Sequence, residues 1–249
     1  MILVIMRGDY FLDQNISFQP LGDSAIFIRF GHEISALTHV EIQQFIKRLQ
    51  VEQPQWLVEI VPAYTSICVH FDLLKVVSSK PDQQSIFEFL AQYFLEIYQN
   101  KTNAETSEAR LIEIPVAYGG RFGADLAYVA KYNNLTEEEV IQLHTENECL
   151  VYMLGFVPGF AYMGGMNGAI STPRKDTPRL AIPAGSVGIA GEQTGVYPFE
   201  TPGGWQIIGR TPQPFFMPDQ NPPTYLRTGD RIRFVAISEE EFLGWEADS

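Results

Sequence analysis

Hydrophobic residues in the first hundred positions follow two different spacings. Short apolar runs bounded by turn residues predict four strands, at Ile16–Leu21, Ala25–Phe30, Trp56–Val61 and Ser66–Phe71. Two longer stretches repeat apolar residues every three or four positions, which predicts amphipathic helices, at Ile42, Phe45, Ile46 and Leu49 and at Ile86, Phe89, Leu90 and Tyr93. This order predicts an α+β fold class, with one antiparallel sheet that carries two helices on one face.

The pattern changes after a polar stretch, Thr102–Glu108, which we interpret as a linker. The next apolar run, Leu111–Val116, predicts a strand that we assign to a second domain. Two short helices are expected after it, at Leu126–Tyr132 and Thr136–His144. The second helix should begin with a capping box, because Glu139 follows Thr136 by three positions.

Glycine and proline dominate the following segment. The stretch Gly155–Pro214 holds 12 of the 20 glycines and 8 of the 16 prolines, a density that breaks helices and predicts short strands joined by turns. We expect an all-β barrel or sandwich here, followed by a polar tail from Glu239. The expected domains are an α/β sandwich domain at 15–107 and a β-barrel domain at 109–238.

Composition and charge narrow the function classes. The chain has 17 Lys and Arg against 30 Asp and Glu, a net charge of −13 at pH 7, which disfavours binding to nucleic acid. The apolar run Met1–Met6 is too short to span a membrane, and no basic residue precedes it as in a signal peptide. Cys68 and Cys149 are isolated in apolar segments, which predicts reduced, buried thiols and a cytoplasmic location.

The charge is distributed unevenly along the chain. From Cys149 to Ile237 we count seven basic residues and five acidic ones, a local charge of +2. The acidic residues could simply collect on the helices. Alternatively, this part could hold an anion site, in which Arg and Lys meet a carboxylate or a phosphate.

The sequence lacks the motifs of several common enzyme classes. No glycine precedes Lys-Ser or Lys-Thr, so there is no P-loop. The spacing of Gly185, Gly188 and Gly191 is not a dinucleotide fingerprint, and no Gly-x-Ser-x-Gly elbow occurs. The zincin-like start at His32-Glu33 fails at Ala36, and no metal site is predicted.

Four strings rich in glycine and proline remain, at Gly155–Gly165, Thr172–Arg179, Ile182–Gly195 and Tyr197–Trp205. Glycine lets a backbone approach a ligand or expose N–H groups to an anion, and proline stiffens such loops. The aromatic residues between them could form the wall of a pocket. The alternative is that these strings are tight turns of a small barrel whose aromatic residues fill the core.

The strings resemble the KipI/PxpB family, the allophanate hydrolase subunit 1-like or carboxyltransferase subdomain C/D proteins. Gly155–Gly165 is similar to the family string GFxPGFxYxG, and Thr172–Trp205 to its TPR…PRxxxPAGSVGIxGxQTGVYPxxTPGGW block. The resemblance runs from about Phe18 to about Val235. It implies an N-terminal α/β domain and a C-terminal cyclophilin-like β-barrel.

The resemblance implies two different functions. PxpB-like members are one component of ATP-dependent 5-oxoprolinase, which converts 5-oxo-L-proline to L-glutamate together with PxpA-like and PxpC-like partners. KipI-like members inhibit a sensor histidine kinase, and both branches share the motifs. ATP is then the expected co-substrate, accompanied by Mg²⁺. Relatives also form part of urea carboxylase, but this chain has no Ala-Met-Lys-Met biotin string. Prolyl isomerisation rests on fold analogy alone.

The resemblance suggests a cationic substrate site. Arg174, Lys175 and Arg179 could hold the carboxylate of 5-oxoproline or a transferred phosphoryl group, or they could form a solvated turn paired with Asp176. Neutral donors and acceptors that suit a lactam amide, or that cap turns and bond within the core, are Gln193, Thr194, Tyr197 and Thr201. Trp205 could form a pocket wall or plug the barrel.

A second pair could transfer protons. His144 is followed four positions later by Glu148, and a His–Glu pair can act as a catalytic acid and base. A histidine at a helix C-terminus is equally explained by the helix dipole. We expect Phe156 and Phe160, which flank Pro158, to pack in the core rather than line a groove.

Overall fold

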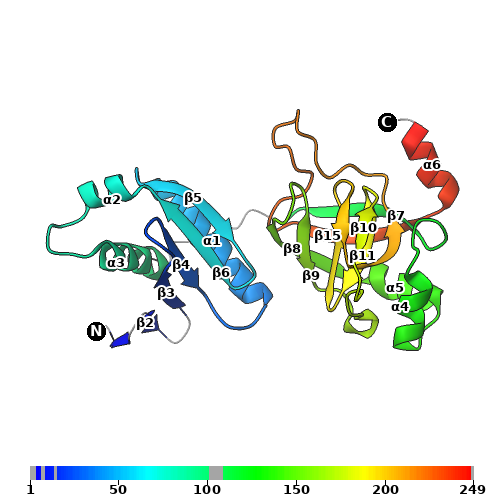
Figure 1. The fold of residues 1–249 in the computed structure, drawn as a ribbon, viewed down its shortest axis with the longest axis horizontal. Helices are drawn as coiled ribbons and strands as arrows, with labels where there is room; N and C mark the ends of the chain where they lie inside the picture. Colours follow the sequence, from blue (N-terminus) through cyan, green and yellow to red (C-terminus); the bar gives the residue numbers. More distant parts are fainter. Residues whose placement is uncertain (1–3, 7–8, 14–15, 101–108, 248–249) are drawn as a thin grey trace. The chain divides into compact units, whose positions relative to one another are not determined.

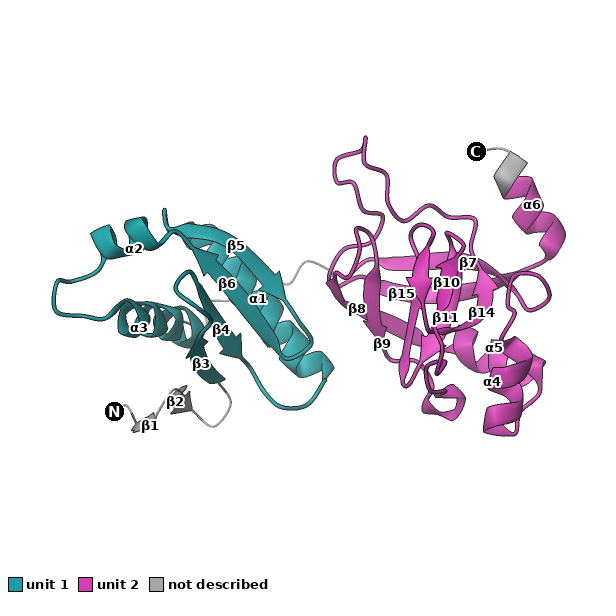
Figure 2. Ribbon diagram, in the orientation of Figure 1, with its two compact units in different colours: residues 1–108 teal, residues 109–249 magenta. Residues whose placement is uncertain are grey.

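The computed structural model describes residues 4–6, 9–13, 16–100 and 109–247. The predicted linker, Thr102–Glu108, lies outside the described residues. The chain divides into two compact units, here called unit 1 (residues 1–108) and unit 2 (residues 109–249) (Figures 1 and 2). Among the described residues, no helix has the length and apolar character needed to cross a bilayer.

Unit 1 is built on an antiparallel sheet with the strand order β1-β2-β3-β4-β6-β5. The strands are β1 Val4–Met6, β2 Asp9–Asp13, β3 Ile16–Pro20, β4 Ala25–Arg29, β5 Leu57–Pro62 and β6 Ser66–Phe71. The four predicted strands are β3 to β6, within one residue at each end. The sequence patterns did not predict β1 and β2.

Two helices cover one face of this sheet, as predicted (Figure 1). Buried residues alternate along β4 and β6, and they form one cluster with apolar residues of α1 and α3. The helices are α1 Ala36–Glu52, α2 Leu73–Ser79 and α3 Ile86–Gln99. Ser35 caps α1, and Ser85 and Glu88 form a capping box on α3. The short helix α2 was not predicted; Asp72 accepts hydrogen bonds from its first turn.

Unit 2 is a closed barrel with the strand order β11-β12-β9-β8-β15-β7-β14. Its strands are β7 Leu111–Tyr118, β8 Glu148–Leu154, β9 Ala161–Gly164, β11 Ser186–Ala190, β12 Gln193–Val196, β14 Gln206–Arg210 and β15 Arg231–Ile237. A separate two-stranded sheet pairs β10 Arg179–Ile182 with β13 Thr201–Gly203. The prediction that the strand from Leu111 belongs to the second domain is confirmed, because β7 pairs with β14 and β15.

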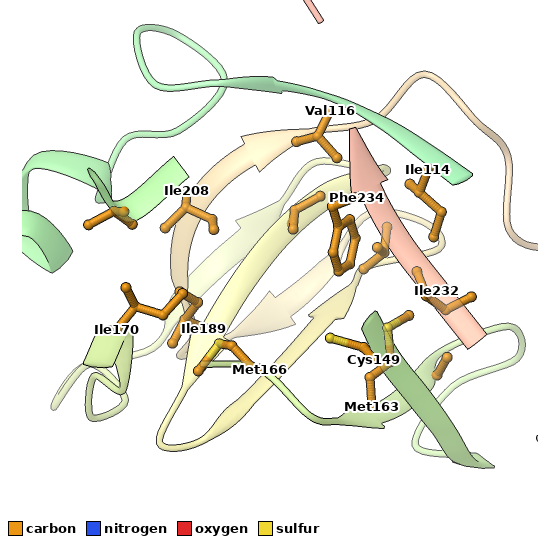
Figure 3. Close-up of a cluster of buried hydrophobic side chains, with 14 of the residues drawn as sticks. Ile114, Val116, Cys149, Met163, Met166, Ile170, Ile189, Ile208, Ile232 and Phe234 are labelled. Carbon is orange, nitrogen blue, oxygen red and sulfur yellow. The ribbon is translucent and has the colours of Figure 1, made fainter. Parts of the chain in front are cut away.

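The barrel is filled by apolar side chains from all sides. Figure 3 shows Ile114, Ile189, Ile208, Ile232 and Phe234 directed into one buried cluster. The remaining helical elements before α6 are α4 Leu126–Asn133, α5 Glu137–Glu146 and the single 3₁₀ turn η1 Gly168–Ile170. The predicted capping box at the start of α5 is present.

The predicted polar tail is wrong, because the chain ends in a helix, α6 Glu239–Ala247. Ser238 and Glu241 exchange hydrogen bonds at its start: the Glu241 N–H donates to Ser238 Oγ, and the Ser238 N–H donates to Glu241 Oε2. Phe242 is buried, with its ring centroid 4.4 Å from that of Phe122. Phe242 thus anchors a helix whose first three residues are exposed glutamates.

Both cysteines are free thiols. Cys149 is buried in the barrel core, and burial raises the pKa of its thiol to about 12. Cys68 lies on β6 and is only half-buried, with its Sγ 3.6 Å from His70 Nε2. The expectation of a buried thiol is therefore confirmed for Cys149 and wrong for Cys68, whose side chain lies on the partly exposed face of the sheet.

Candidate active site on the barrel

A buried carboxylate, Asp125, organises the predicted cations. It follows a glycine-rich turn and directly precedes α4, and it is 4% exposed. Arg179 donates two hydrogen bonds, Nη1 to Oδ2 at 2.7 Å and Nη2 to Oδ1 at 2.8 Å. Lys175 Nζ donates to Oδ1 at 3.1 Å, and the backbone N–H of Ile207 donates to Oδ2 at 2.7 Å. The carboxylate therefore ties the Thr172–Arg179 loop to the barrel wall.

The donors around Asp125 keep it ionised. Burial alone raises the pKa of this carboxyl, but the hydrogen bonds from Arg179, Ile207 and Lys175 outweigh burial and lower its pKa overall. Conversely, the pKa of Arg179 is raised, chiefly by its hydrogen bonds with Asp125. Two cations and one anion form the cluster, so its net charge is positive. Lys175 and Arg179 do not form the solvated turn with Asp176 that was the alternative prediction.

The loop that carries these cations is held at several points. The Lys175 N–H donates to the Gly204 carbonyl at 2.7 Å, and Gln206 Nε2 donates to the Pro173 carbonyl at 2.9 Å. At the start of the loop, Thr172 Oγ1 accepts a hydrogen bond from Asn133 Nδ2 at 3.0 Å. These bonds fix the backbone on both sides of Arg174.

Arg174 itself is exposed and lies over an aromatic ring. Its Cζ atom is 6.0 Å from the centroid of Trp205, at the outer limit of a cation–π contact. Because its backbone is fixed and its guanidinium faces solvent, Arg174 is the predicted cation best placed to meet a ligand from outside the barrel.

Buried aromatic rings support this surface. The ring centroids of Phe160 lie 5.5 Å from Trp205 and 5.8 Å from Tyr197, in edge-to-face geometry. Trp205 is 5% exposed and Tyr197 2% exposed, so the Trp205 ring packs as a plug. Of the two phenylalanines expected in the core, Phe160 is buried, but Phe156 is 64% exposed. Its backbone has a φ of 67°, in the left-handed region, which turns its side chain outward.

The four neutral residues predicted for lactam binding differ in burial and in their partners. Thr194 is fully buried inside the barrel, where its Oγ1 lies 2.8 Å from His144 Nε2. Gln193 is half-buried at the start of β12, and Thr201 is half-buried on β13, opposite Ile182 of β10. The structure therefore gives Thr194 a place in the core, bonded to His144.

His144 and Glu148 are not brought together. His144 is 1% exposed, and its Nδ1 lies 2.7 Å from the Tyr118 hydroxyl. Burial lowers its pKa to about 3, so it is neutral. Glu148 instead pairs with Arg231 and Arg233, the latter at 2.6 Å. The physical reason is that α5 ends at Glu146 and Glu148 begins β8, so the residues are not one helical turn apart.

Asp125 is a site residue that the sequence patterns did not predict. It stands in the string Gly119-Gly-Arg-Phe-Gly-Ala-Asp125, immediately before an expected helix. An aspartate there suggests a helix N-cap, but its side chain makes no cap hydrogen bond. The sequence signal that could have identified Asp125 is the glycine-rich stretch before it. In the structure this stretch is a turn in which Gly119 and Gly120 have positive φ.

Comparison with known proteins places the chain in a family. The carboxyltransferase domain family, subdomains C and D, matches residues 16–226. The chain is 47% identical to the B subunit of 5-oxoprolinase from Bacillus subtilis over 93% of this chain and 97% of that protein. It is 41% identical to the B subunit of 5-oxoprolinase from Haemophilus influenzae over 87% of this chain and 95% of that protein. The crystal structure of a conserved uncharacterized protein from Pyrococcus horikoshii is 46% identical, with a TM-score of 0.53 over 90% of this chain and 99% of that one.

Proposed function

The chain belongs to the family of the carboxyltransferase domain, subdomains C and D, and on this basis we propose that it is the B subunit of an ATP-dependent 5-oxoprolinase. One observation carries the proposal: its 47% identity to the B. subtilis protein of that name spans 97% of that protein. The agreement extends through both units and is not confined to one motif.

In the proposed reaction, 5-oxo-L-proline becomes L-glutamate while ATP becomes ADP and phosphate. The γ-phosphoryl group of ATP is transferred to the lactam oxygen, and ADP leaves. Water then adds to the lactam carbon and the C–N bond breaks, with the proton going to the nitrogen. A second water releases phosphate from the resulting acyl phosphate. Negative charge develops near the substrate oxygen, where cations stabilise it.

The loop Thr172–Arg179 is the part of this chain that we assign to that task. Arg174 would contact the substrate carboxylate or the transferred phosphoryl group, because it is exposed while its backbone is fixed. Lys175 and Arg179 would act as positioning residues through Asp125. His144 and Glu148 would not act together as a proton-transfer pair, because His144 contacts Tyr118 and Glu148 pairs with Arg233.

The remaining parts of the site would come from other subunits. We propose PxpC-like and PxpA-like partners, with ATP bound by loops of this chain and its PxpC-like partner, since the sequence has no P-loop. Among the residues that the structure describes, no three His, Cys, Asp or Glu side chains form a group that could hold a metal ion. Mg²⁺ would therefore be held largely by the phosphates of ATP.

The test is reconstitution of the chain with both partners. We expect ATP hydrolysis that depends on 5-oxoproline, with L-glutamate as the product. Arg174→Gln should lower kcat/KM by roughly 10- to 100-fold, because one stabilising cation is lost. Arg227→Gln serves as the matched control, since Arg227 is another exposed arginine of unit 2.

Two results would contradict the proposal. The first is a folded three-subunit mixture with no ATP hydrolysis dependent on 5-oxoproline. The second is inhibition of a sensor histidine kinase by the chain alone, combined with the absence of that ATP hydrolysis. The alternative, that the chain is a KipI-like inhibitor, stays a prediction. It requires that the chain inhibit kinase autophosphorylation.

A further inference from the structure

A pocket of about 230 Å³ lies within unit 2, between the barrel and α6. Leu243 of α6 forms part of its wall, and Phe122, Ile182 and Ile207 provide further apolar surface. Ser186 adds a hydroxyl group. The pocket is smaller than most sites for drug-sized ligands, so it suits a small molecule or ion.

Ten described residues line this pocket; three of them are arginines, and none of these ten is acidic. Arg121 comes from the turn before Asp125, Arg179 begins β10 and Arg210 ends β14. The three residues are far apart in the sequence, and the fold brings them around one cavity. In a chain with a net charge of −13, a gathering of three arginines around one cavity is a specific feature rather than a reflection of composition.

Each of these guanidinium groups is held in position from outside the pocket lining. Arg179 is bidentate to Asp125, and Arg121 lies 2.8 Å from a carboxylate oxygen of Glu239 at the start of α6. Arg210 Nε donates to the Ala184 carbonyl at 2.7 Å. An arginine has five N–H donors in a rigid fork, so a group held along one edge can still donate along another.

We propose that this pocket binds a small oxyanion, a carboxylate or a phosphate, through Arg121, Arg179 and Arg210, with α6 as one wall. Guanidinium groups recognise both anions by paired, charge-assisted hydrogen bonds. The apolar residues around them fit a ligand with a short carbon skeleton. The wall formed by α6 lies beyond residues 16–226, the part matched by the family.

The pocket is connected to the loop of the proposed active site. Arg179 lines the pocket and also binds Asp125, which holds Lys175 of the same loop as Arg174. An anion in the pocket would compete with Asp125 for the Arg179 guanidinium, or add to the charges that hold it. Occupation of the pocket therefore has a direct physical route to the position of the loop.

Calorimetric titration of the full chain tests the proposal. The probes are inorganic phosphate, 5-oxo-L-proline and L-glutamate, with sodium chloride at matched ionic strength as the control; this choice of organic anions rests on the proposed function. We expect saturable binding of one equivalent of at least one probe. Binding of phosphate alone identifies a phosphate site, and binding of the organic acids identifies a carboxylate site.

Three variants locate the binding. Arg121→Gln and Arg210→Gln should each weaken the Kd by roughly 10- to 100-fold, since each removes a charged hydrogen-bond donor. Leu243→Trp should block the pocket without a change of charge, and it guards against misfolding caused by the arginine substitutions. Arg227→Gln should leave the Kd unchanged, and thermal melting should confirm that every variant is folded.

The proposal is overturned if no probe binds at millimolar concentrations, or if the folded variants bind as tightly as the wild type. Failure of the proposed function is a separate outcome. A reconstituted complex that hydrolyses 5-oxoproline while the isolated chain binds no anion overturns only the pocket. Anion binding that depends on Arg210, without 5-oxoprolinase activity, overturns only the function.

Discussion

Among the described residues, unit 1 buries three polar side chains, whereas unit 2 buries eight. Those of unit 1 are Ser17, His39 and Ser66, and those of unit 2 are Asp125, His144, Thr172, Ser186, Thr194, Gln206, Thr211 and Asp230. Burial of a polar group costs free energy unless hydrogen bonds satisfy it. Unit 2 satisfies its buried carboxylates with arginine partners, at Asp125 and at Asp230.

The core of unit 1 depends mainly on apolar and aromatic packing. Phe30 and Phe45 pack edge to face at 5.3 Å, and Trp56 and Phe94 do so at 5.8 Å. Both units have an apolar core, but unit 2 also buries the polar groups that position charged side chains. Candidate chemistry belongs to unit 2, where buried polar groups are concentrated.

The strongest effect on stability is expected in the apolar core of unit 1. Phe45 is fully buried, so Phe45→Ala should lower the free energy of unfolding of unit 1 by about 3 to 5 kcal/mol through lost contacts and a cavity. Hydrogen exchange measured by mass spectrometry distinguishes the two units. Val51→Ala on the same helix is the control, since Val51 is 85% exposed. Equal loss of protection in unit 2 would contradict the separation of the two cores.

Acidification should test the buried histidine of unit 2. The pKa of His144 is lowered from 6.5 to about 3 in the folded state, so below pH 6.5 the unfolded chain takes up a proton that the folded chain does not. The free energy of unfolding is therefore unaffected by this titration above pH 6.5, and it falls by about 4 kcal/mol as the pH is lowered to 3.

The comparison variant is His144→Gln, in which this titration is absent. Its unfolding free energy in unit 2, followed by hydrogen exchange or denaturant titration, should depend less steeply on pH between 6.5 and 3. An identical slope in the wild type and the variant would show that His144 is not the titrating group.

Removal of the charge of Asp125 should have a somewhat smaller effect. Asp125→Asn weakens the bonds from Arg179, Lys175 and Ile207, and we expect a loss of about 2 kcal/mol at pH 7, because both cations are partly exposed to solvent. The folded-state pKa of Asp125 is lowered, so its stabilisation is present above the unfolded value of about 3.9 and lost as the pH falls further.

Denaturant titration at pH 7 and near pH 3 measures this dependence. The difference between the wild type and Asp125→Asn should shrink at the lower pH. Asp176→Asn, at an exposed aspartate of the same loop, should change stability little. A loss at Asp176 as large as that at Asp125 would contradict the role given to the buried carboxylate.

The weakest effect on stability is expected at the surface of unit 2. Arg174 is exposed, so Arg174→Gln should change the free energy of unfolding by no more than about 0.5 kcal/mol. Its loss of activity in the reconstituted complex would then come from chemistry alone. A thermal melt alongside the activity assay distinguishes a loss of stability from a loss of catalysis. A strongly lowered Tm would show that Arg174 has a structural role.

The sequence predicted most elements because their signals are local. The apolar spacing around Phe45 and the capping box at Thr136 and Glu139 act within one or two helical turns, and both are confirmed. The helix α6 was missed for the opposite reason. Its three leading glutamates indicate a solvated tail, and only tertiary contacts, with Phe122 among others, make Phe242 a buried anchor.

The candidate site was predicted only in part. The strings identified the loop with Arg174, Lys175 and Arg179, and the resemblance to the family agrees with the match over residues 16–226. The pairing of His144 with Glu148 was wrong in geometry, because the chain changes from helix to strand between them.

Local signals along the chain are sufficient for the α+β class, the β-rich second unit and the glycine-proline loops, because periodicity, caps and turn residues operate over short stretches. Which charges meet depends instead on the folded barrel. Asp125 lies 50 and 54 positions from Lys175 and Arg179, and the pocket arginines come from three separate segments. Pairings over such distances arise when the barrel closes, because strand order and register place the side chains together.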